Sequence, residues 1–344
     1  MIPIAVYGKQ QTGDTIQYVL AADVGGTKAN LALVQVEGLK MQLLKRKKYP
    51  SQEYASFIDI ITDFIQDVPH KPGKICVGVA GPVINGEVEF TNLSWMVSEK
   101  ELSRETGVTA VALINDLEAT AYGLATLPDE DFTVLHAGNG APAAGNIAII
   151  APGTGLGEAA LFFDGRAFHP FATEGGHTGF APRTALDYRL LQYLQQQNKV
   201  VSWEHVIAGP AIYVLYQFLR DAEKMQEPEW LTKLLAEGKD PSAVVSSTAI
   251  EKQEPLCVKT MELYIRYLGY ESTNLVLKMK ASGGLYISGG IPPKILPLLQ
   301  QPAYYAAYCD CDRMNDLVEA VPIRVIMNDH APLFGAAYYG AHGI

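Results

Sequence analysis

Two turns built from glycine and threonine are the residues of this chain whose types and spacing most clearly indicate chemistry. Gly25-Gly26-Thr27 follows the apolar run 19–24, and Gly153-Thr154-Gly155 follows the apolar run 147–152. A second apolar run follows each turn, so each pattern predicts a buried strand, a tight turn and a returning strand. Glycine leaves the backbone amides uncovered, and such amides beside a threonine hydroxyl suit phosphate oxygens. Two such turns could hold one polyphosphate from two sides.

Asp23 lies near the end of the first apolar run, beside the first turn. One interpretation is a carboxylate near bound Mg²⁺, in contact through water, because this ion keeps several waters and takes few protein ligands. The other is an Asx-turn residue that only caps the hairpin. The presence of a second phosphate-type turn favours the magnesium interpretation.

Asn115 and Asp116 follow the apolar run 110–114. Because open α/β folds bind ligands at the carboxyl ends of their strands, a carboxylate here could accept a proton from a substrate hydroxyl. The neighbouring amide could orient a second hydroxyl. Alternatively, Asp116 caps the helix expected over 117–127, and its position alone favours that role.

Three further side chains could bind a polyhydroxylated ligand as a set: Glu174 and His177 of the loop Glu174-Gly175-Gly176-His177, and Glu204. Taken singly, His177 is more simply a structural histidine and Glu204 a solvated helix start. A zinc site lacks a third soft ligand nearby. Ser288-Gly289-Gly290 is either a flat backbone platform for a base or ribose, or a strand-to-helix turn that needs small residues.

Composition excludes several classes of protein. The chain has 344 residues, a net charge of −10 and four cysteines. An acidic protein is a poor general binder of nucleic acids or anionic membranes, and the scattered cysteines argue against structural zinc and suit a reducing cytoplasm. No apolar run is long enough to span a membrane, and neither the Walker motif nor G-x-G-x-x-G occurs at the two turns. Residues 1–17 are expected to be a short extension before the first core strand.

Strands and helices that alternate along the chain predict an α/β fold. Each glycine turn opens a three-stranded meander followed by helical sequence, so the two copies indicate two related domains. The Gly-, Ala- and Pro-rich stretch 128–145 is the expected linker. Ser98-x-x-Glu101 resembles a capping box, and 248–280 is expected to be helical with a possible interruption at Gly269.

Six short motifs, in this order, resemble those of the bacterial glucokinase family, of the type without a zinc cluster, within the superfamily of sugar kinases, heat-shock ATPases and actin. They are Asp-Val-Gly-Gly-Thr at 23–27, Thr-Asn-x-x-Trp at 91–95, Ile-Asn-Asp at 114–116, Gly-Thr-Gly-Leu-Gly at 153–157, Glu-Gly-Gly-His at 174–177 and Ser-Gly-Gly-Ile at 288–291. The resemblance covers about residues 18–342.

The resemblance implies two related actin-like (ribonuclease H-like) ATPase domains flanking a cleft. The small domain would hold residues 18–130 and 329–344, and the large one residues 131–328. The implied activity is an ATP-dependent glucokinase that phosphorylates the 6-hydroxyl of glucose, the first step of glycolysis. A cytoplasmic homodimer is also implied, with glucose and ATP as its partners and no nucleic acid or membrane.

The resemblance also implies roles for single residues. Asp116 matches the general base. The sugar contacts match Asn92, Asn115, Asp116, Glu174, His177 and Glu204. The phosphate sites match the turns 23–27 and 153–157, and the adenosine region matches 288–290, with Mg²⁺ beside Asp23.

One departure from the family pattern stands out, and one absence separates the chain from a neighbouring family. Lys28 occupies a position where the family usually has asparagine, so this cation contacts a phosphate or only solvent. No cysteine lies beside the loop 174–179, which argues against the zinc-binding repressor, open-reading-frame and kinase family. The alternatives are a kinase for another hexose or an N-acetylhexosamine, and a non-catalytic sugar-binding regulator.

Overall fold

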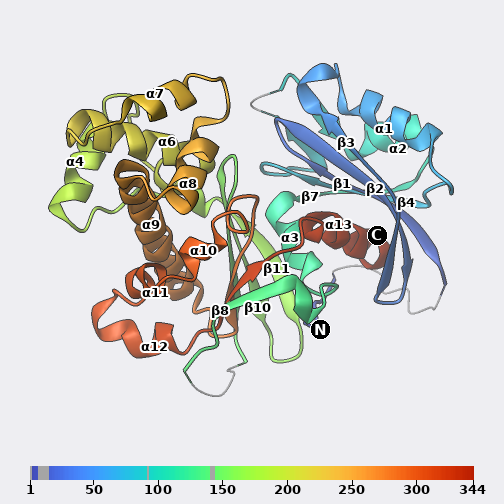
Figure 1. The fold of residues 1–344 in the computed structure, drawn as a ribbon. Helices are drawn as coiled ribbons and strands as arrows, with labels where there is room; N and C mark the ends of the chain where they lie inside the picture. Colours follow the sequence, from blue (N-terminus) through green and yellow to red (C-terminus); the bar gives the residue numbers. More distant parts are fainter. Residues whose placement is uncertain (1, 7–14, 91–92, 140–143) are drawn as a thin grey trace. The chain divides into compact units, whose positions relative to one another are not determined.

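The chain forms two units, each containing a β-sheet, in a computed structural model that describes residues 2–6, 15–90, 93–139 and 144–344 (Figure 1). The first unit holds Met1–Asp131, Ala159–Ala172 and Asn328–Ile344, and the second holds Phe132–Glu158 and Thr173–Met327. Strands and helices alternate in both, which confirms the predicted α/β class.

Residues 159–172 cluster with the first unit, although the sequence assigned them to the second domain. The reason is a backbone connection to the chain's start. Ile4 forms a parallel bridge with Phe168, the Ala5 amide donates to the Phe168 carbonyl over 2.8 Å, and the Tyr338 hydroxyl donates to the Ile4 carbonyl over 3.0 Å. The described residues Ile4 and Ala5 are thus hydrogen-bonded to other segments of the first unit.

In the described part of the first unit, five strands form a sheet in the order β3-β2-β1-β4-β7. Their bounds are β1 (Gln17–Val24), β2 (Lys28–Glu37), β3 (Lys40–Pro50), β4 (Lys74–Val79) and β7 (Ala110–Asn115). β1 pairs antiparallel with β2, whereas β1, β4 and β7 run parallel. The carboxyl ends of these three strands consequently share one edge of the sheet.

Helices cover both faces of this sheet (Figure 1). They are α1 (Phe57–Gln66), α2 (Glu99–Thr106), α3 (Asp116–Gly123) and α13 (Ala331–Gly343). Because side chains alternate along a strand, Leu20 of β1 packs in the cluster that contains α1 residues, whereas Val19 points toward α13. Gly340 makes the second contact possible, since a Cβ there would lie 2.7 Å from Val19 Cγ1.

The second sheet has the order β11-β10-β9-β12-β13-β8 over the described residues. Its strands are β8 (Phe132–His136), β9 (Ile147–Pro152), β10 (Leu156–Phe163), β11 (Phe168–Thr173), β12 (Gly284–Ile287) and β13 (Ile323–Ile326). The second unit's helices are α4 (Ala185–Leu194), α5 (Glu204–Ile207), α6 (Gly209–Gln217), α7 (Glu229–Leu235), α8 (Pro241–Glu251), α9 (Pro255–Met279), α10 (Leu296–Leu299), α11 (Pro302–Tyr308) and α12 (Asn315–Glu319).

The expected linker over 128–145 is wrong in part, because it contains a strand of the second sheet. β8 pairs antiparallel with β13. Its pattern of half-buried residues lacks the continuous apolar run of a central strand, which is why composition alone suggested a linker.

The expected helix over 248–280 consists of two helices that separate at 252–254 and not at Gly269. Gln253 has a φ of 53°, in the left-handed region that ends a helix. Gly269 lies inside α9, where its missing side chain lets α11 approach: a Cβ would come 2.8 Å from Ala307 Cβ. No helix in the described ranges is both long and apolar enough to cross a lipid bilayer.

The capping box predicted at Ser98 is also wrong. Ser98 is the N-cap of α2, but its side chain makes no capping hydrogen bond and instead donates to Glu87 Oε1 over 3.5 Å. Glu87 lies opposite Ser98 in the ribbon of β5 (Glu87–Glu89) and β6 (Met96–Ser98), so a cross-strand neighbour replaces the capping partner.

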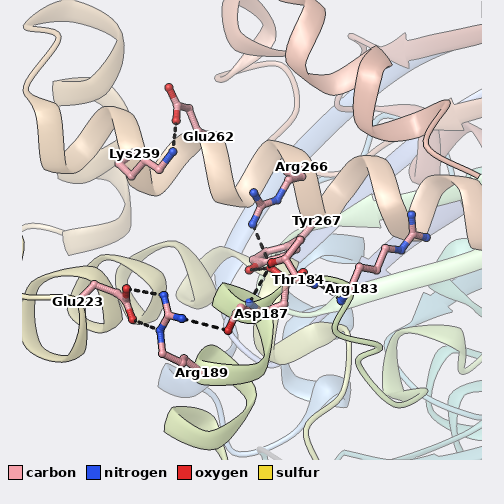
Figure 2. A network of polar contacts seen from close by, with 10 residues as sticks. Arg183, Thr184, Asp187, Arg189, Glu223, Lys259, Glu262, Arg266 and Tyr267 are labelled. Atoms are coloured by element: carbon pink, nitrogen blue, oxygen red, sulfur yellow. Dashed lines mark hydrogen bonds and ion pairs between the residues drawn. The ribbon is translucent and has the colours of Figure 1, made fainter.

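A buried carboxylate connects α4 to α9 (Figure 2). Asp187 is fully buried and accepts hydrogen bonds from the Tyr267 hydroxyl over 2.8 Å and from Arg266 Nη2 over 3.0 Å. It also accepts from the amides of Arg183 over 3.0 Å and Thr184 over 2.8 Å, which closes the capping box that starts α4. One charge thus anchors the helix start and the segment before it to α9.

Replacing this carboxylate should destabilise the protein strongly. Asp187→Ala leaves two amides, a tyrosine hydroxyl and an arginine without their buried acceptor, so we expect the free energy of unfolding to fall by about 3–5 kcal/mol. Denaturant titration measures this loss. The control is Glu262→Ala, which breaks the half-exposed pair with Lys259 and should cost less than about 1 kcal/mol. Equal effects of the two variants would contradict the role given to Asp187.

Candidate functional site

The first glycine turn, at the edge of the first sheet, is closed by a backbone hydrogen bond and is hydrogen-bonded to Ser51. The Gly25 amide donates to the Lys28 carbonyl over 3.0 Å. Ser51, which is fully buried, donates from its hydroxyl to the Gly25 carbonyl over 2.9 Å and from its amide to the Thr27 carbonyl over 3.1 Å. Thr27 and Lys28 are exposed. The turn is therefore rigid and still presents its hydroxyl and a cation to solvent.

Asp23 is paired with a residue that the sequence did not single out. Asn30 lies opposite Asp23 in the β1–β2 register and donates from Nδ2 to Asp23 Oδ2 over 3.2 Å. Burial raises the pKa of Asp23, whereas the hydrogen bond from Asn30 and the charges of Lys28 and Arg46 lower it. The buried Asn30 Oδ1 has no hydrogen-bond partner within the described residues. The Asn30 amide therefore satisfies Asp23 through its nitrogen, whereas its own oxygen accepts no hydrogen bond from the described residues.

Asn115, and not Asp116, is the N-cap of α3. Asn115 Oδ1 accepts from the amides of Leu117 over 2.9 Å and Glu118 over 3.3 Å, while Asp116 is the first residue of the helix. Asp116 Oδ1 also accepts from the Leu117 amide over 2.9 Å, and its side chain is partly exposed. The helix start holds the carboxylate in a defined orientation, but it does not depend on that carboxylate as its cap.

Strand register brings Asp116 to the same edge of the sheet as Asp23. Asp23 of β1 lies opposite Gly78 of β4, and Gly78 lies opposite Ile114 of β7. Two strand spacings put Asp23 and Ile114 roughly 10 Å apart. Gly78 also allows the first turn of α3 to pack on the sheet, because a Cβ there would lie 3.1 Å from Ala119 Cβ. The turn, Asp23 and Asp116 therefore form one group.

The second glycine turn is fastened to two other segments of the second unit. The Gly153 carbonyl accepts from the Gly209 amide at the start of α6 over 2.8 Å. Glu204 Oε2 accepts from the Leu156 amide over 2.9 Å, and it would lie 2.5 Å from a Cβ at Gly155. Glu204 is thus held against the turn and is not a free solvated helix start. Thr154 at the tip remains exposed.

The loop 174–177 rests directly on β10. A Cβ on Gly176 would come 2.1 Å from the Leu156 carbonyl oxygen, so only glycine fits. Glu174 and His177 project outward with 60% and 62% of their side chains exposed, and their Oε2 and Nε2 atoms are 3.9 Å apart. The Trp203 amide donates to the Thr178 carbonyl over 3.0 Å, which joins this loop to the segment that carries Glu204.

Ser288-Gly289-Gly290 lies against the end of β9. The Ser288 amide donates to the Ile150 carbonyl over 2.8 Å. Gly289 has a φ of 94°, and a Cβ there would lie 2.5 Å from the Pro152 carbonyl oxygen. This segment and the turn 153–155 are therefore neighbours at one edge of the second sheet.

A cavity of about 280 Å³ opens beside the second turn, between the end of α4 and the starts of α5 and α6. Thr154, Glu204 and His205 are among its lining residues. No group of three or more histidine, cysteine, aspartate or glutamate side chains suited to a metal ion occurs in the described ranges.

The structure thus brings the candidate residues into two groups, one in each unit. The first group consists of Asp23, Gly25, Gly26, Thr27, Asn115 and Asp116. The second group consists of Gly153, Thr154, Gly155, Glu174, His177, Glu204, Ser288, Gly289 and Gly290. Asn92 lies outside the described residues. The sequence did not identify Asn30, Ser51 and Gly209 as part of the site. Asn30 lies within β2 and Ser51 begins a short 3-10 helix, and neither residue belongs to a recognisable motif.

Comparisons with known proteins point to one family. A family model described as Glucokinase matches residues 20–342. The chain is 35% identical over 338 residues to a glucokinase from Nostoc sp., covering 94% of this chain and 98% of the relative. A glucokinase structure from an Antarctic psychrotroph has a TM-score of 0.80 and 30% identity, covering 95% of this chain and 99% of the other.

A more distant structure shares the fold. A ROK family glucokinase from Streptomyces griseus, in complex with glucose and AMPPNP, has a TM-score of 0.63 and 20% identity, covering 94% of this chain and 99% of the other.

The close seating of the loop 174–177 on β10 predicts a sharp difference between two glycines. Gly176→Ala forces a methyl group against the Leu156 carbonyl, and we expect it to lower the free energy of unfolding by about 1–3 kcal/mol. Gly179→Ala is the control, because no atom lies within 4 Å of a Cβ there, and its change should stay within about 0.5 kcal/mol. Denaturant titration of both variants tests the difference; similar values would contradict the packing described.

Proposed function

The chain belongs to the glucokinase family, a group of phosphotransferases that act on a sugar hydroxyl, and we propose that its own residues perform this reaction with ATP and glucose as follows. The family match supports the resemblance of the six sequence motifs. One observation carries the residue assignments: the first glycine turn, Asp23 and Asp116 share the edge formed by β1, β4 and β7.

We propose that Asp116 is the general base. Phosphoryl transfer needs positioning and charge stabilisation more than covalent chemistry, so a single oriented carboxylate suffices for the proton. Asp116 accepts the proton of the glucose 6-hydroxyl as that oxygen attacks the γ-phosphorus of ATP. The bond from this phosphorus to the bridging oxygen breaks, and ADP leaves with that oxygen. The hydrogen bond from the Leu117 amide to Asp116 Oδ1 orients the carboxylate, and Asn115 relieves it of the capping role.

The sugar contacts are proposed for Asn92, Asn115, Glu174, His177 and Glu204. The exposed side chains of Glu174 and His177 are available for hydroxyl groups, and both can exchange a hydrogen bond with water for one with the sugar. Glu204 is tied to the Leu156 amide by one oxygen, which orients the carboxylate toward the second turn.

The phosphate and nucleotide contacts are proposed for the turns 25–27 and 153–155 and for the platform 288–290. Each turn exposes its threonine, and the platform adjoins the second turn through the Pro152 carbonyl. The AMPPNP bound to the Streptomyces griseus structure is an ATP analogue, which supports ATP as the donor. Lys28 is exposed beside the first turn and is placed to attract a phosphate.

Mg²⁺ fits the first unit's group of residues. Asp23 and Asn30 Oδ1, which accepts no hydrogen bond from the described residues, offer oxygen ligands. A site with one carboxylate suits an ion that also binds substrate phosphates and water. When bound, Mg²⁺ supplies neutralisation of phosphate charge. Homodimeric assembly and a cytoplasmic location remain predictions from the family resemblance.

Removing the proposed base should abolish turnover and spare the fold. We expect Asp116→Asn to lower kcat by about 10²–10⁴-fold, with a KM for glucose near that of the parent, because only proton acceptance is lost. A coupled assay of ADP release measures both constants. Asp129→Asn is the control, since it removes an exposed carboxylate and should leave kcat unchanged. Near-parent turnover by Asp116→Asn would refute the base assignment.

The magnesium assignment predicts a change in metal dependence. We expect Asp23→Asn to raise the Mg²⁺ concentration that gives half-maximal activity by about 10–100-fold, with little change in the KM for glucose. Titrating Mg²⁺ against ADP release at saturating glucose and ATP tests this. An unchanged magnesium titration would remove Asp23 from the site.

The alternatives separate in one experiment. ADP release is measured with glucose, mannose, fructose and N-acetylglucosamine, and sugar binding is measured in parallel. We expect the highest kcat/KM with glucose. Higher kcat/KM with another sugar would reassign the substrate, and glucose binding without ADP release would indicate a non-catalytic regulator.

A further inference from the structure

Two buried carboxyl groups meet beneath the loop 174–177, and no part of the reaction described above uses them. Glu158 of β10 is 1% exposed and Glu271 of α9 is fully buried. Glu271 accepts a hydrogen bond from Asn274 Nδ2 over 2.7 Å and pairs with Lys278 Nζ over 3.2 Å. Asn274 and Lys278, both on α9, thus donate hydrogen bonds to Glu271.

These contacts decide which carboxyl carries the charge. Burying two carboxylates side by side is costly, so the pair retains one proton. Burial and then the charge of Glu271 raise the pKa of Glu158 to about 8, and Lys278 opposes this. Burial also raises the pKa of Glu271, but Asn274 and Lys278 lower it. Since Glu158 Oε1 is buried without a hydrogen-bond partner in the described residues, Glu158 is the neutral member.

Glu158 contacts the loop through side chain and backbone. Its Oε2 lies directly beneath Gly175, where a Cβ would come within 2.0 Å of it. The Thr173 hydroxyl donates to the Glu158 carbonyl over 2.9 Å and accepts from the Gly175 amide over 3.2 Å. Because Gly175 has no side chain, nothing separates the Glu158 carboxyl from the loop backbone.

We propose that Glu158 is a positioning residue whose neutral carboxyl seats the loop 174–177 for glucose binding, and whose ionisation unseats it. The proposal rests on the glucose-binding role of this loop proposed above. A second negative charge beside Glu271 is unfavourable in this buried site. Gly175 is the loop residue that the Glu158 carboxyl contacts, so ionisation of Glu158 acts on the loop at that residue. Of the loop's own titratable groups, Glu174 and His177 are both more than half exposed, so water screens their charges.

The consequence is weaker glucose binding at alkaline pH, with turnover at saturating glucose preserved. If binding requires a proton on a group with a pKa of about 8, affinity at pH 9 is about tenfold lower than at pH 7. Between the ordinary pKa of a glutamate and a pH of about 8, the folded protein retains the proton on Glu158, whereas the unfolded chain has released it. The parent therefore loses stability as pH rises from the ordinary glutamate range through about 8.

The experiment measures the Kd for glucose by calorimetry and the KM and kcat by ADP release, from pH 6.5 to 9.5, in the full chain. The parent should show the tenfold fall in affinity between pH 7 and 9 with nearly constant kcat. Glu158→Gln stays neutral at every pH, so its affinity should be flat. Glu271→Gln removes the neighbouring charge and should move the fall to lower pH. Glu262→Gln, an exposed residue of α9, should retain the parent profile.

Three outcomes would overturn the proposal. The first is a parent protein whose affinity for glucose does not change with pH. The second is a Glu158→Gln variant whose affinity changes with pH as the parent's does. The third is that substitutions of Glu158 and Glu271 change the pH dependence of thermal unfolding but leave that of glucose affinity unchanged. Should Glu158→Gln fail to fold, the direction of the shift in Glu271→Gln decides. A parent that does not phosphorylate glucose at pH 7 would instead refute the proposed function.

Discussion

Close contact between backbones, possible only at glycine, is the constraint on which the second unit's group of residues depends. The loop 174–177 rests on β10 because Gly175 and Gly176 offer no Cβ to the Glu158 carboxyl and the Leu156 carbonyl. Gly209 allows α6 to meet the second turn, and Gly289 allows the platform 288–290 to meet β9. Because no side chain lies between these segments at the glycines, their backbones pack directly against each other. The positions of the polar side chains on the segments are therefore fixed by the packing of the backbone.

Buried carboxylates are stabilised in three different ways in this protein. Asp187 is surrounded by donors and binds a helix start to α9. Asp23 accepts from one side-chain donor among the described residues, Asn30, and the charges of Lys28 and Arg46 act on it, which suits the metal-binding role proposed for it. Glu158 and Glu271 share one proton beneath a loop, which makes them sensitive to pH. The number of donors around each group therefore separates a structural role from a ligand-binding or titrating one.

The first unit depends on a different constraint, which brings the Asp116 carboxylate and the first glycine turn to one edge of its sheet. Parallel strands do this because β1, β4 and β7 end at one edge and fix the spacing between Asp23 and the start of α3. Gly78, on the strand between them, lets α3 start close to the sheet. The position of Asp116 thus follows from sheet geometry and one small residue.

The sequence by itself determined the α/β class, the two glycine hairpins and the family, because apolar periodicity, glycine turns and ordered motifs are local properties of the chain. It also identified Asp23, Asp116 and the loop 174–177 as candidates. Only the tertiary structure decided that Asn115 is the cap of α3, that Asn30 pairs with Asp23, and that Glu158 and Glu271 meet. Asn115 acts through the geometry of a helix start, Asn30 and Asp23 are opposite each other in a strand register, and Glu158 and Glu271 come together in a packed core. The sequence spacing of Glu158 and Glu271 carries no signal of a contact that exists only when β10 packs against α9.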